Sequence, residues 1–164
     1  MDSVQLQLHA LVLGLDRRSS IDILTKMMLS CHKSPLKLII HTSASILPAV
    51  EITKFDFVVL LVDGSKAECL DSLRDAVSKL DIGYFSRKCC TVSVTASVAQ
   101  GVQRNYREIQ KVLYLFPLAS TMPIWNCNFE EEKDVEVLAC RILKCMSLCW
   151  HHMGVLVCEV TGRT

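Results

Sequence analysis

The segment after the first predicted strand is where phosphate chemistry would be expected. A phosphate-binding loop has the form G-x-x-x-x-G-K-[ST], in which glycines let backbone N–H groups surround phosphate, the lysine reaches the outer phosphates and the hydroxyl binds Mg²⁺. Counting from Gly14, this chain has Ser19 at the second glycine, Ser20 at the lysine and Ile21 at the hydroxyl position. The motif is degenerate, and we predict that it binds no cofactor.

Other signatures of a nucleotide site are also missing from the sequence. A guanine-specific site would place N-K-x-D just after a strand, whereas the segment 95–98 holds no carboxylate. No D-x-x-G follows a predicted strand. The segment 63–65 is better explained as a turn and a helix cap. Asp16 adds negative charge where a triphosphate would lie, although Arg17 and Arg18 could bind an anion. A divergent small GTPase or nucleotide-binding protein that uses these arginines is the alternative.

Cysteine and histidine residues near the carboxyl end have a spacing found in metal sites. Cys145, Cys149 and His152 lie at i, i+4 and i+7 of the last predicted helix. No second Cys pair or His pair completes a set of four ligands, so cysteines that face the core are the favoured interpretation. No Ser/His/Asp arrangement has local support. We therefore predict no metal site, no catalytic residue and no enzyme activity.

The elements that would position these residues alternate along the chain. Apolar runs and alternation predict strands, and apolar residues with a helical period predict amphipathic helices. The predicted strands are 4–13, 36–40, 55–62, 89–95 and 122–128. The predicted helices are 19–31, 65–80, 102–116 and 133–152, two of them capped by Ser19 with Asp22 and by Ser65 with Glu68. Because parallel strands need helical crossovers, the alternation of strands and helices predicts an α/β three-layer sandwich with a mostly parallel sheet of five or six strands.

Composition limits the classes of function. The 164 residues are 51% hydrophobic with a net charge of +1, which gives no field to attract nucleic acid or an anionic membrane. The amino end lacks the features of a signal peptide, and the nine cysteines are interpreted as free thiols of a reducing compartment, cytosol or nucleus. We expect one domain over 1–153, followed by a tail over 154–164.

Two apolar features of the carboxyl-terminal region indicate a protein partner. Val137 and Leu148 lie together on the polar side of the last predicted helix, three turns apart. The tail that follows is apolar and predicts either an added edge strand or a docking segment. The predicted partner-binding residues are Val137, Leu148, Val155, Leu156, Val157 and Val160.

The middle of the chain resembles a known family. The segments 55–63 and 81–90, together with Leu70, closely resemble centromere protein M, and 36–37 and 45–48 are similar to it as well. The resemblance implies a small-GTPase-like fold that has lost nucleotide binding and hydrolysis. It also implies a nuclear subunit of the inner kinetochore at the centromere, in a complex with centromere proteins I, H and K.

Three functions remain distinct at this point. The first is a non-catalytic structural subunit whose apolar surface is covered only in a complex, without a nucleic-acid, membrane or small-molecule partner. The second is the divergent GTPase, and the third is a flavodoxin-like ligand-binding protein. The segment 42–54 is too short for a further strand and helix, so the hairpin strand and switch II helix of small GTPases are expected to be absent.

Overall fold

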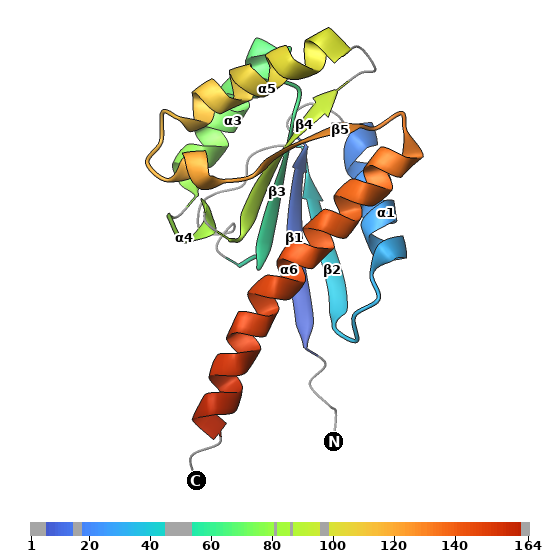
Figure 1. Cartoon of the computed structure of the whole chain (residues 1–164), viewed down its shortest axis with the longest axis vertical. Coiled ribbons are helices and arrows are strands. Elements are labelled where there is room, and N and C mark those ends of the chain that lie inside the picture. Colours follow the sequence, from blue (N-terminus) through green and yellow to red (C-terminus); the bar gives the residue numbers. More distant parts are fainter. Residues whose placement is uncertain are drawn as a thin grey trace.

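A five-stranded sheet in which all neighbouring strands are parallel forms the centre of the computed structural model (Figure 1). The structure describes residues 6–14, 18–44, 54–80, 82–85, 87–95 and 99–161, with side chains of the last helix described as far as Cys149. The strands are β1 (Gln7–Gly14), β2 (Lys37–Ser43), β3 (Phe57–Val62), β4 (Cys89–Thr95) and β5 (Ile124–Asn128). Their order, β2-β1-β3-β4-β5, is that of a doubly wound sheet.

Helices cover both faces of this sheet, which confirms the predicted three layers (Figure 1). On one face lie α1 (Arg18–Cys31) and α6 (Glu132–Thr161), and on the other lie α3 (Ala67–Lys79) and α5 (Ala99–Leu113). The short α4 (Ile82–Phe85) and the 3-10 turn η1 (Ala119–Thr121) contact each other and were not predicted.

Two apolar layers hold the sandwich together, one on each side of the sheet. Strand β1 alternates between them: Leu11 and Leu13 pack toward α3 and α5, and Ala10 and Val12 pack toward α1 and α6. All six residues of β3 are buried, as expected for a central parallel strand. Cys89 and Cys90 fall in opposite layers, so the expectation that they point apart is confirmed.

Several predicted boundaries were wrong for local reasons. Helix α5 begins at Ala99, three residues earlier than predicted. It ends early because Leu115 and Phe116 donate i→i−3 bonds that tighten the chain into a turn. Strand β5 begins after Pro123, which has no N–H to donate to the sheet. Strand β2 continues to Ser43, since an edge strand accommodates polar residues.

The predicted cap of α3 was also wrong. The Ser65 hydroxyl donates to Asp63 Oδ1 at 2.6 Å, and the Ser65 N–H donates to the same oxygen at 3.0 Å. This side-chain turn uses the hydroxyl that was expected to cap the helix. The N-cap residue is instead Lys66, whose side chain makes no capping hydrogen bond. The apolar stripe predicted for this helix is confirmed by the burial of Cys69, Leu73, Ala76 and Val77. Helix α1 begins at Arg18, so Ser19 lies inside its first turn and is not its N-cap.

Helix α6 is longer than the sequence indicated. It runs to Thr161, so the residues 155–160 are helical and the edge-strand alternative was wrong. The valines favoured a strand, but a helix that has already formed extends at little cost where no proline stops it. Its 30 residues span about 45 Å, and the carboxyl-terminal half continues past the end of the sheet (Figure 1).

Candidate functional site

The carboxyl ends of β1 and β2 border a cavity of about 390 Å³ beside the first turn of α1. Ile21, Asp22 and the segment 42–44 line it. Ile21 has no hydroxyl that could bind a metal, and its side chain is 4% exposed and packs in the core. Ser20 is also buried, and Gly14 closes β1. The lining thus holds a carboxylate and no cation among the side chains that the structure describes.

The predicted anion ligands cannot be placed. Asp16 and Arg17 lie wholly outside the described residues, as do the side chains of Arg18 and Ser19. The degenerate phosphate loop therefore stays a prediction from the residue types.

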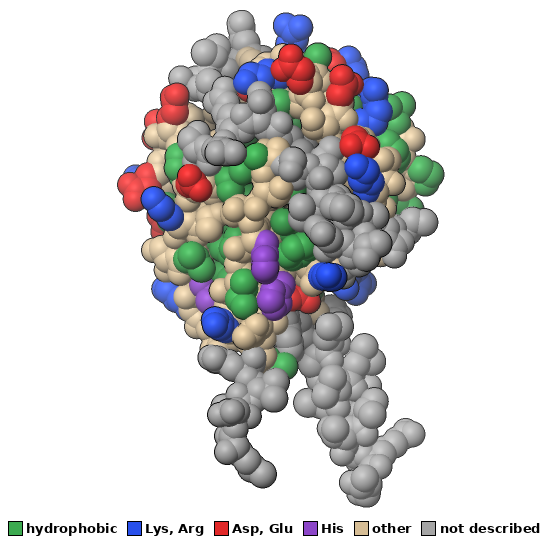
Figure 2. Space-filling model, turned by 180° about the vertical axis from the view of Figure 1, so that it is seen from behind, with side chains coloured by type: hydrophobic (Ala, Val, Ile, Leu, Met, Phe, Trp, Pro, Cys, Tyr) green, Lys and Arg blue, Asp and Glu red, His purple; other side chains and the backbone are tan. Residues whose placement is uncertain are grey.

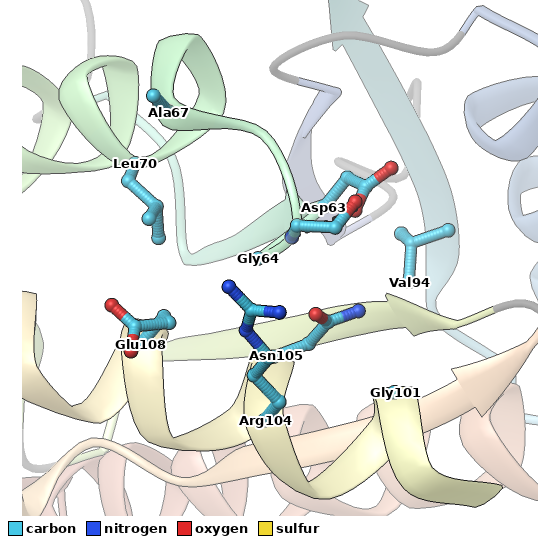
Figure 3. A pocket seen from close by; sticks show the side chains of 10 residues that line it. Asp63, Gly64, Ala67, Leu70, Val94, Gly101, Arg104, Asn105 and Glu108 are labelled. Carbon is cyan, nitrogen blue, oxygen red and sulfur yellow. Dashed lines mark hydrogen bonds between the residues drawn. The ribbon is translucent and has the colours of Figure 1, made fainter. Parts of the chain in front are cut away.

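A second cavity, of about 490 Å³, lies between α3 and α5 at the carboxyl ends of β3 and β4 (Figure 3). We call it the α3/α5 cavity. Its lining combines apolar side chains with carboxylates, a guanidinium and a carboxamide: Asp63, Gly64, Ser65, Ala67, Leu70, Val94, Gly101, Arg104, Asn105 and Glu108. In a doubly wound sheet, ligands bind outside the carboxyl ends of the strands, and this cavity lies in that region.

One wall of the α3/α5 cavity is fixed by a close approach of two backbones. A Cβ added at Gly64 would lie 2.5 Å from the carbonyl oxygen of Asn105 and 2.9 Å from its Cα. Only glycine allows α5 to pack this closely on the turn after β3. Asn105 is 8% exposed, and its carboxamide extends from α5 toward that turn (Figure 3).

The charges around the α3/α5 cavity are of both signs. Lys111 donates to Glu108 at 2.8 Å, and this bond, more than the charge of Lys111 or of Arg104, lowers the pKa of the Glu108 carboxyl. Arg104 extends toward α3 and forms no ion pair with any residue in the described part of the chain (Figure 3). The guanidinium is thus available to an anionic group.

The thiols proposed as metal ligands have other surroundings. The Cys149 thiol donates to the carbonyl of Arg87 at 2.9 Å, and partial burial raises the pKa of both Cys145 and Cys149. The side chain of His152 lies outside the described residues. Within the part of the chain that is described, no three His, Cys, Asp or Glu side chains gather as metal ligands.

A pair of histidines was missed by the sequence analysis. The rings of His9 on β1 and His41 on β2 stack with their centroids 5.4 Å apart, and His9 Nδ1 lies 3.1 Å from His41 Nε2. Phe55 packs edge-on against His41. Figure 2 shows histidines in contact on the face opposite α6, where acidic and basic side chains intermix rather than gather by sign. The pair arises from strand register, which the residue types do not specify.

The solvent side of α6 carries the apolar residues predicted to bind a partner. Val137 is 51% exposed and Leu148 is 56% exposed. A shallow groove of about 520 Å³ runs along this side and is lined by Lys133, Glu136, Val137, Cys140, Arg141 and Lys144. We call Val137, Leu148 and this groove the α6 outer face. The exposure is observed, whereas the contact with a partner remains a prediction.

The turn after α5 contains exposed apolar residues that were not predicted to have a role. Tyr114, Leu115 and Leu118 are each more than half exposed. Leu118 has φ of 66°, an unusual left-handed conformation for leucine. The tail residues Val155, Leu156, Val157 and Val160 lie on the last turns of α6, with side chains outside the described part. Across the described residues, no helix has the length and apolarity to span a membrane.

The strand order and layers define a doubly wound α/β domain, and solved structures share this fold. Nucleolar GTP-binding protein 1 from Plasmodium falciparum matches with a TM-score of 0.50 and 10% identity, covering 97% of this chain and 100% of that one. Oxidised flavodoxin 2 from Bacillus cereus matches with a TM-score of 0.50 and 12% identity, over 85% of this chain and 97% of the other. The fold is thus a small-GTPase-like α/β sandwich, as the resemblance implied.

The family follows from the sequence. The family model for centromere protein M (CENP-M) matches residues 7–160, and the chain belongs to that family. It is therefore a centromere and kinetochore protein. No curated protein matches the chain significantly.

Proposed function

We propose that this chain is a non-catalytic structural subunit of the inner kinetochore, a pseudo-GTPase that binds and stabilises other centromere proteins in the nucleus. Its partners are centromere proteins I, H and K, and its role is kinetochore assembly for chromosome segregation. Membership of the centromere protein M family supports the centromeric setting, and the α6 outer face supports a role in binding.

The observation that carries this proposal is the pair of exposed apolar residues on α6. Val137 and Leu148 are each more than half exposed on a helix whose opposite side is fully buried. Exposed apolar residues that line up beside a groove are a feature of surfaces that bind other proteins. Covering them would remove apolar area from water, at about 25 cal/mol per Å².

The end of α6 extends this surface. The helix passes beyond the sheet (Figure 1), so its last turns are placed where a neighbouring protein can reach them. The tail residues Val155, Leu156, Val157 and Val160 belong to these turns. We assign the tail, 154–164, to docking and 1–153 to the sandwich domain.

Loss of nucleotide binding is supported by the first turn of α1. An active phosphate loop needs a lysine and a metal-binding hydroxyl where this chain has Ser20 and Ile21, and both residues are buried. The Asp22 carboxylate faces the adjacent cavity. It would repel the phosphates that a helix N-terminus otherwise attracts.

Co-expression tests the partner assignment. The full chain should elute with centromere proteins I, H and K as one complex in size-exclusion chromatography. Without them a larger fraction of the chain should aggregate or be degraded, because its apolar surface stays exposed. A chain that stays monomeric and soluble alone, and elutes apart from all three, would contradict the assignment.

A divergent GTPase is the second candidate, favoured by the fold shared with the nucleolar GTP-binding protein. Calorimetric titration of the folded chain with GTP, GDP and ATP in Mg²⁺ separates the two. The pseudo-GTPase should release no heat of binding at micromolar nucleotide. Binding that is lost in an Arg17→Gln, Arg18→Gln variant would establish the GTPase instead.

A further inference from the structure

Two cysteines that are far apart in the sequence meet where helix α1 ends against helix α6. The helices pack directly on one another, and the thiol of Cys31, the last residue of α1, forms a hydrogen bond with the thiol of Cys140 on α6. The charge of Glu136, one helical turn before Cys140, also acts on Cys31. The side of α6 that carries Glu136 and Cys140 therefore faces the end of α1.

These two thiols differ from most other cysteines in their access to solvent. Cys140 is the only exposed cysteine in the described part of the chain, and Cys31 is half-buried. Four cysteines are enclosed in the core: Cys69, Cys89, Cys90 and Cys127. Cys140 also lines the open groove of the α6 outer face, which a small dissolved oxidant can enter. Oxidation of the folded chain is therefore expected to begin at Cys140 rather than in the core.

The surroundings of Cys31 suit it to the second step of such a reaction. Partial burial, followed by its hydrogen bond with Cys140 and the charges of Cys140 and Glu136, raises the pKa of the Cys31 thiol. A thiol with a raised pKa keeps its proton at neutral pH and reacts slowly with an oxidant in solution. Proximity compensates for this when the target is a sulfur held beside it, and Cys140 holds that position.

We propose that Cys31 and Cys140 form a reversible disulfide when the chain meets a peroxide. The Cys140 sulfur attacks hydrogen peroxide and the O–O bond breaks, which leaves a sulfenic acid and one water molecule. The Cys31 sulfur then attacks the sulfenic sulfur, so the S–S bond forms, the S–O bond breaks and a second water molecule leaves. Two thiols thus lose two electrons and two protons, and one peroxide becomes two water molecules. A dissolved thiol such as glutathione reverses the reaction by exchange.

The disulfide ties α1 to α6 in the folded chain. It closes a loop of about 110 residues, and a cross-link over a loop of this length strongly restricts the unfolded chain. The melting temperature of the oxidised chain should therefore rise by about 10 °C. The inference goes beyond the proposed function, because the reaction needs no partner protein.

Peptide mapping tests the bond directly. The reduced full chain is treated with a stoichiometric amount of hydrogen peroxide, its remaining thiols are alkylated, and it is digested with trypsin without reduction. Trypsin cleaves after Lys and Arg, so Cys31 falls in the peptide 27–33 and Cys140 in the peptide 134–141, and neither peptide holds another cysteine. Mass spectrometry should find these peptides joined, and dithiothreitol should separate them.

Single substitutions locate the bond. Cys31→Ser and Cys140→Ser should each abolish the joined peptides and the rise in melting temperature. Cys149→Ser is the matched control, because Cys149 lies on the same helix as Cys140 and a serine hydroxyl can donate the same hydrogen bond to the Arg87 carbonyl. This control should form the disulfide as the wild type does. Oxidation in urea should instead give mixed pairings, because the contact between the two thiols depends on the fold.

Contrary results are specific. Peptides 27–33 and 134–141 that stay separate at millimolar peroxide would overturn the proposal, as would a disulfide that joins Cys140 to a different cysteine. Equal formation of the bond in urea would show that the fold does not bring the two thiols together. An oxidised chain that carries the bond and melts at or below the temperature of the reduced chain would show that the bond does not fit the folded state.

Discussion

The two sides of helix α6 use apolar residues for different purposes. The side toward the sheet is fully covered by it, with Val135, Leu138, Ala139, Ile142 and Met146 each no more than 3% exposed. On the outer side, Val137 and Leu148 leave more than half of their surface to solvent. Val137 and Leu148 are as apolar as the covered residues, so the hydrophobicity of a side chain alone does not distinguish a folding residue from a binding residue. The distinction depends on what the rest of the chain covers.

Truncation on the covered side should have the largest effect on stability. Ile142 is fully buried, and Ile142→Ala should lower the free energy of unfolding by about 2–5 kcal/mol, through lost burial and the cavity that it leaves. Urea denaturation followed by circular dichroism measures the change. A loss below about 1 kcal/mol would show that this side of α6 is not packed as described.

Covered and open positions also differ at the glycines. Gly64→Ala should cost about 1–3 kcal/mol, because the new Cβ would meet the Asn105 carbonyl oxygen at 2.5 Å. Gly101→Ala meets nothing within 4 Å and should instead stabilise α5 by about 0.5–1 kcal/mol. The two melting temperatures should therefore move in opposite directions. Equal shifts of the same sign would contradict the close approach of α5 to the turn after β3.

Buried thiols extend the contrast to pH. Burial raises the pKa of Cys127 to about 12 and raises those of Cys89 and Cys90 as well. The folded chain keeps these protons while the unfolded chain releases them above its own thiol pKa, so stability should fall as pH rises through about 9. With an ordinary thiol pKa of 9.0 in the unfolded chain, each thiol contributes about 0.8 kcal/mol between pH 8 and pH 9.5.

Urea denaturation under reducing conditions at both pH values measures this loss. In Cys127→Ala the fall should be smaller by the share of one thiol. A stability that does not change over this range would show that the thiols are not buried in the folded chain.

The smallest effect on stability is expected on the outer side of α6. Leu148→Ala should change the free energy of unfolding by no more than about 0.5 kcal/mol, because its side chain is already 56% exposed. Urea denaturation of Leu148→Ala and Ile142→Ala under the same conditions compares their free energies of unfolding directly. A cost near that of Ile142→Ala would mean that Leu148 supports the fold rather than a partner.

Local patterns predicted the elements that carry their own periodicity. The range of β4 and the buried stripe of α3 agree with the structure because alternation and a helical period are encoded in adjacent residues. The end of α6 was missed because its valines favour strands, whereas the helix before it favours continuation. The cap at Ser65 was missed because Asp63 competes for the hydroxyl.

The candidate sites depended more strongly on contacts between distant segments. The α3/α5 cavity exists because Asn105 packs against Gly64, and the histidine pair exists because of the register between β1 and β2. Neither relation is encoded in a local pattern. The exposure of Val137 and Leu148, by contrast, was predictable from the period of a single helix.

The most direct test of the central claim places charge on the α6 outer face and measures assembly. Val137→Asp with Leu148→Asp is co-expressed with centromere proteins I, H and K, and the matched control is Leu29→Asp, which changes a leucine of α1 that is 51% exposed. The double variant should fold, as judged by circular dichroism, and lose co-elution with the three proteins, while the control retains it. A double variant that still co-elutes in full would contradict partner binding through α6.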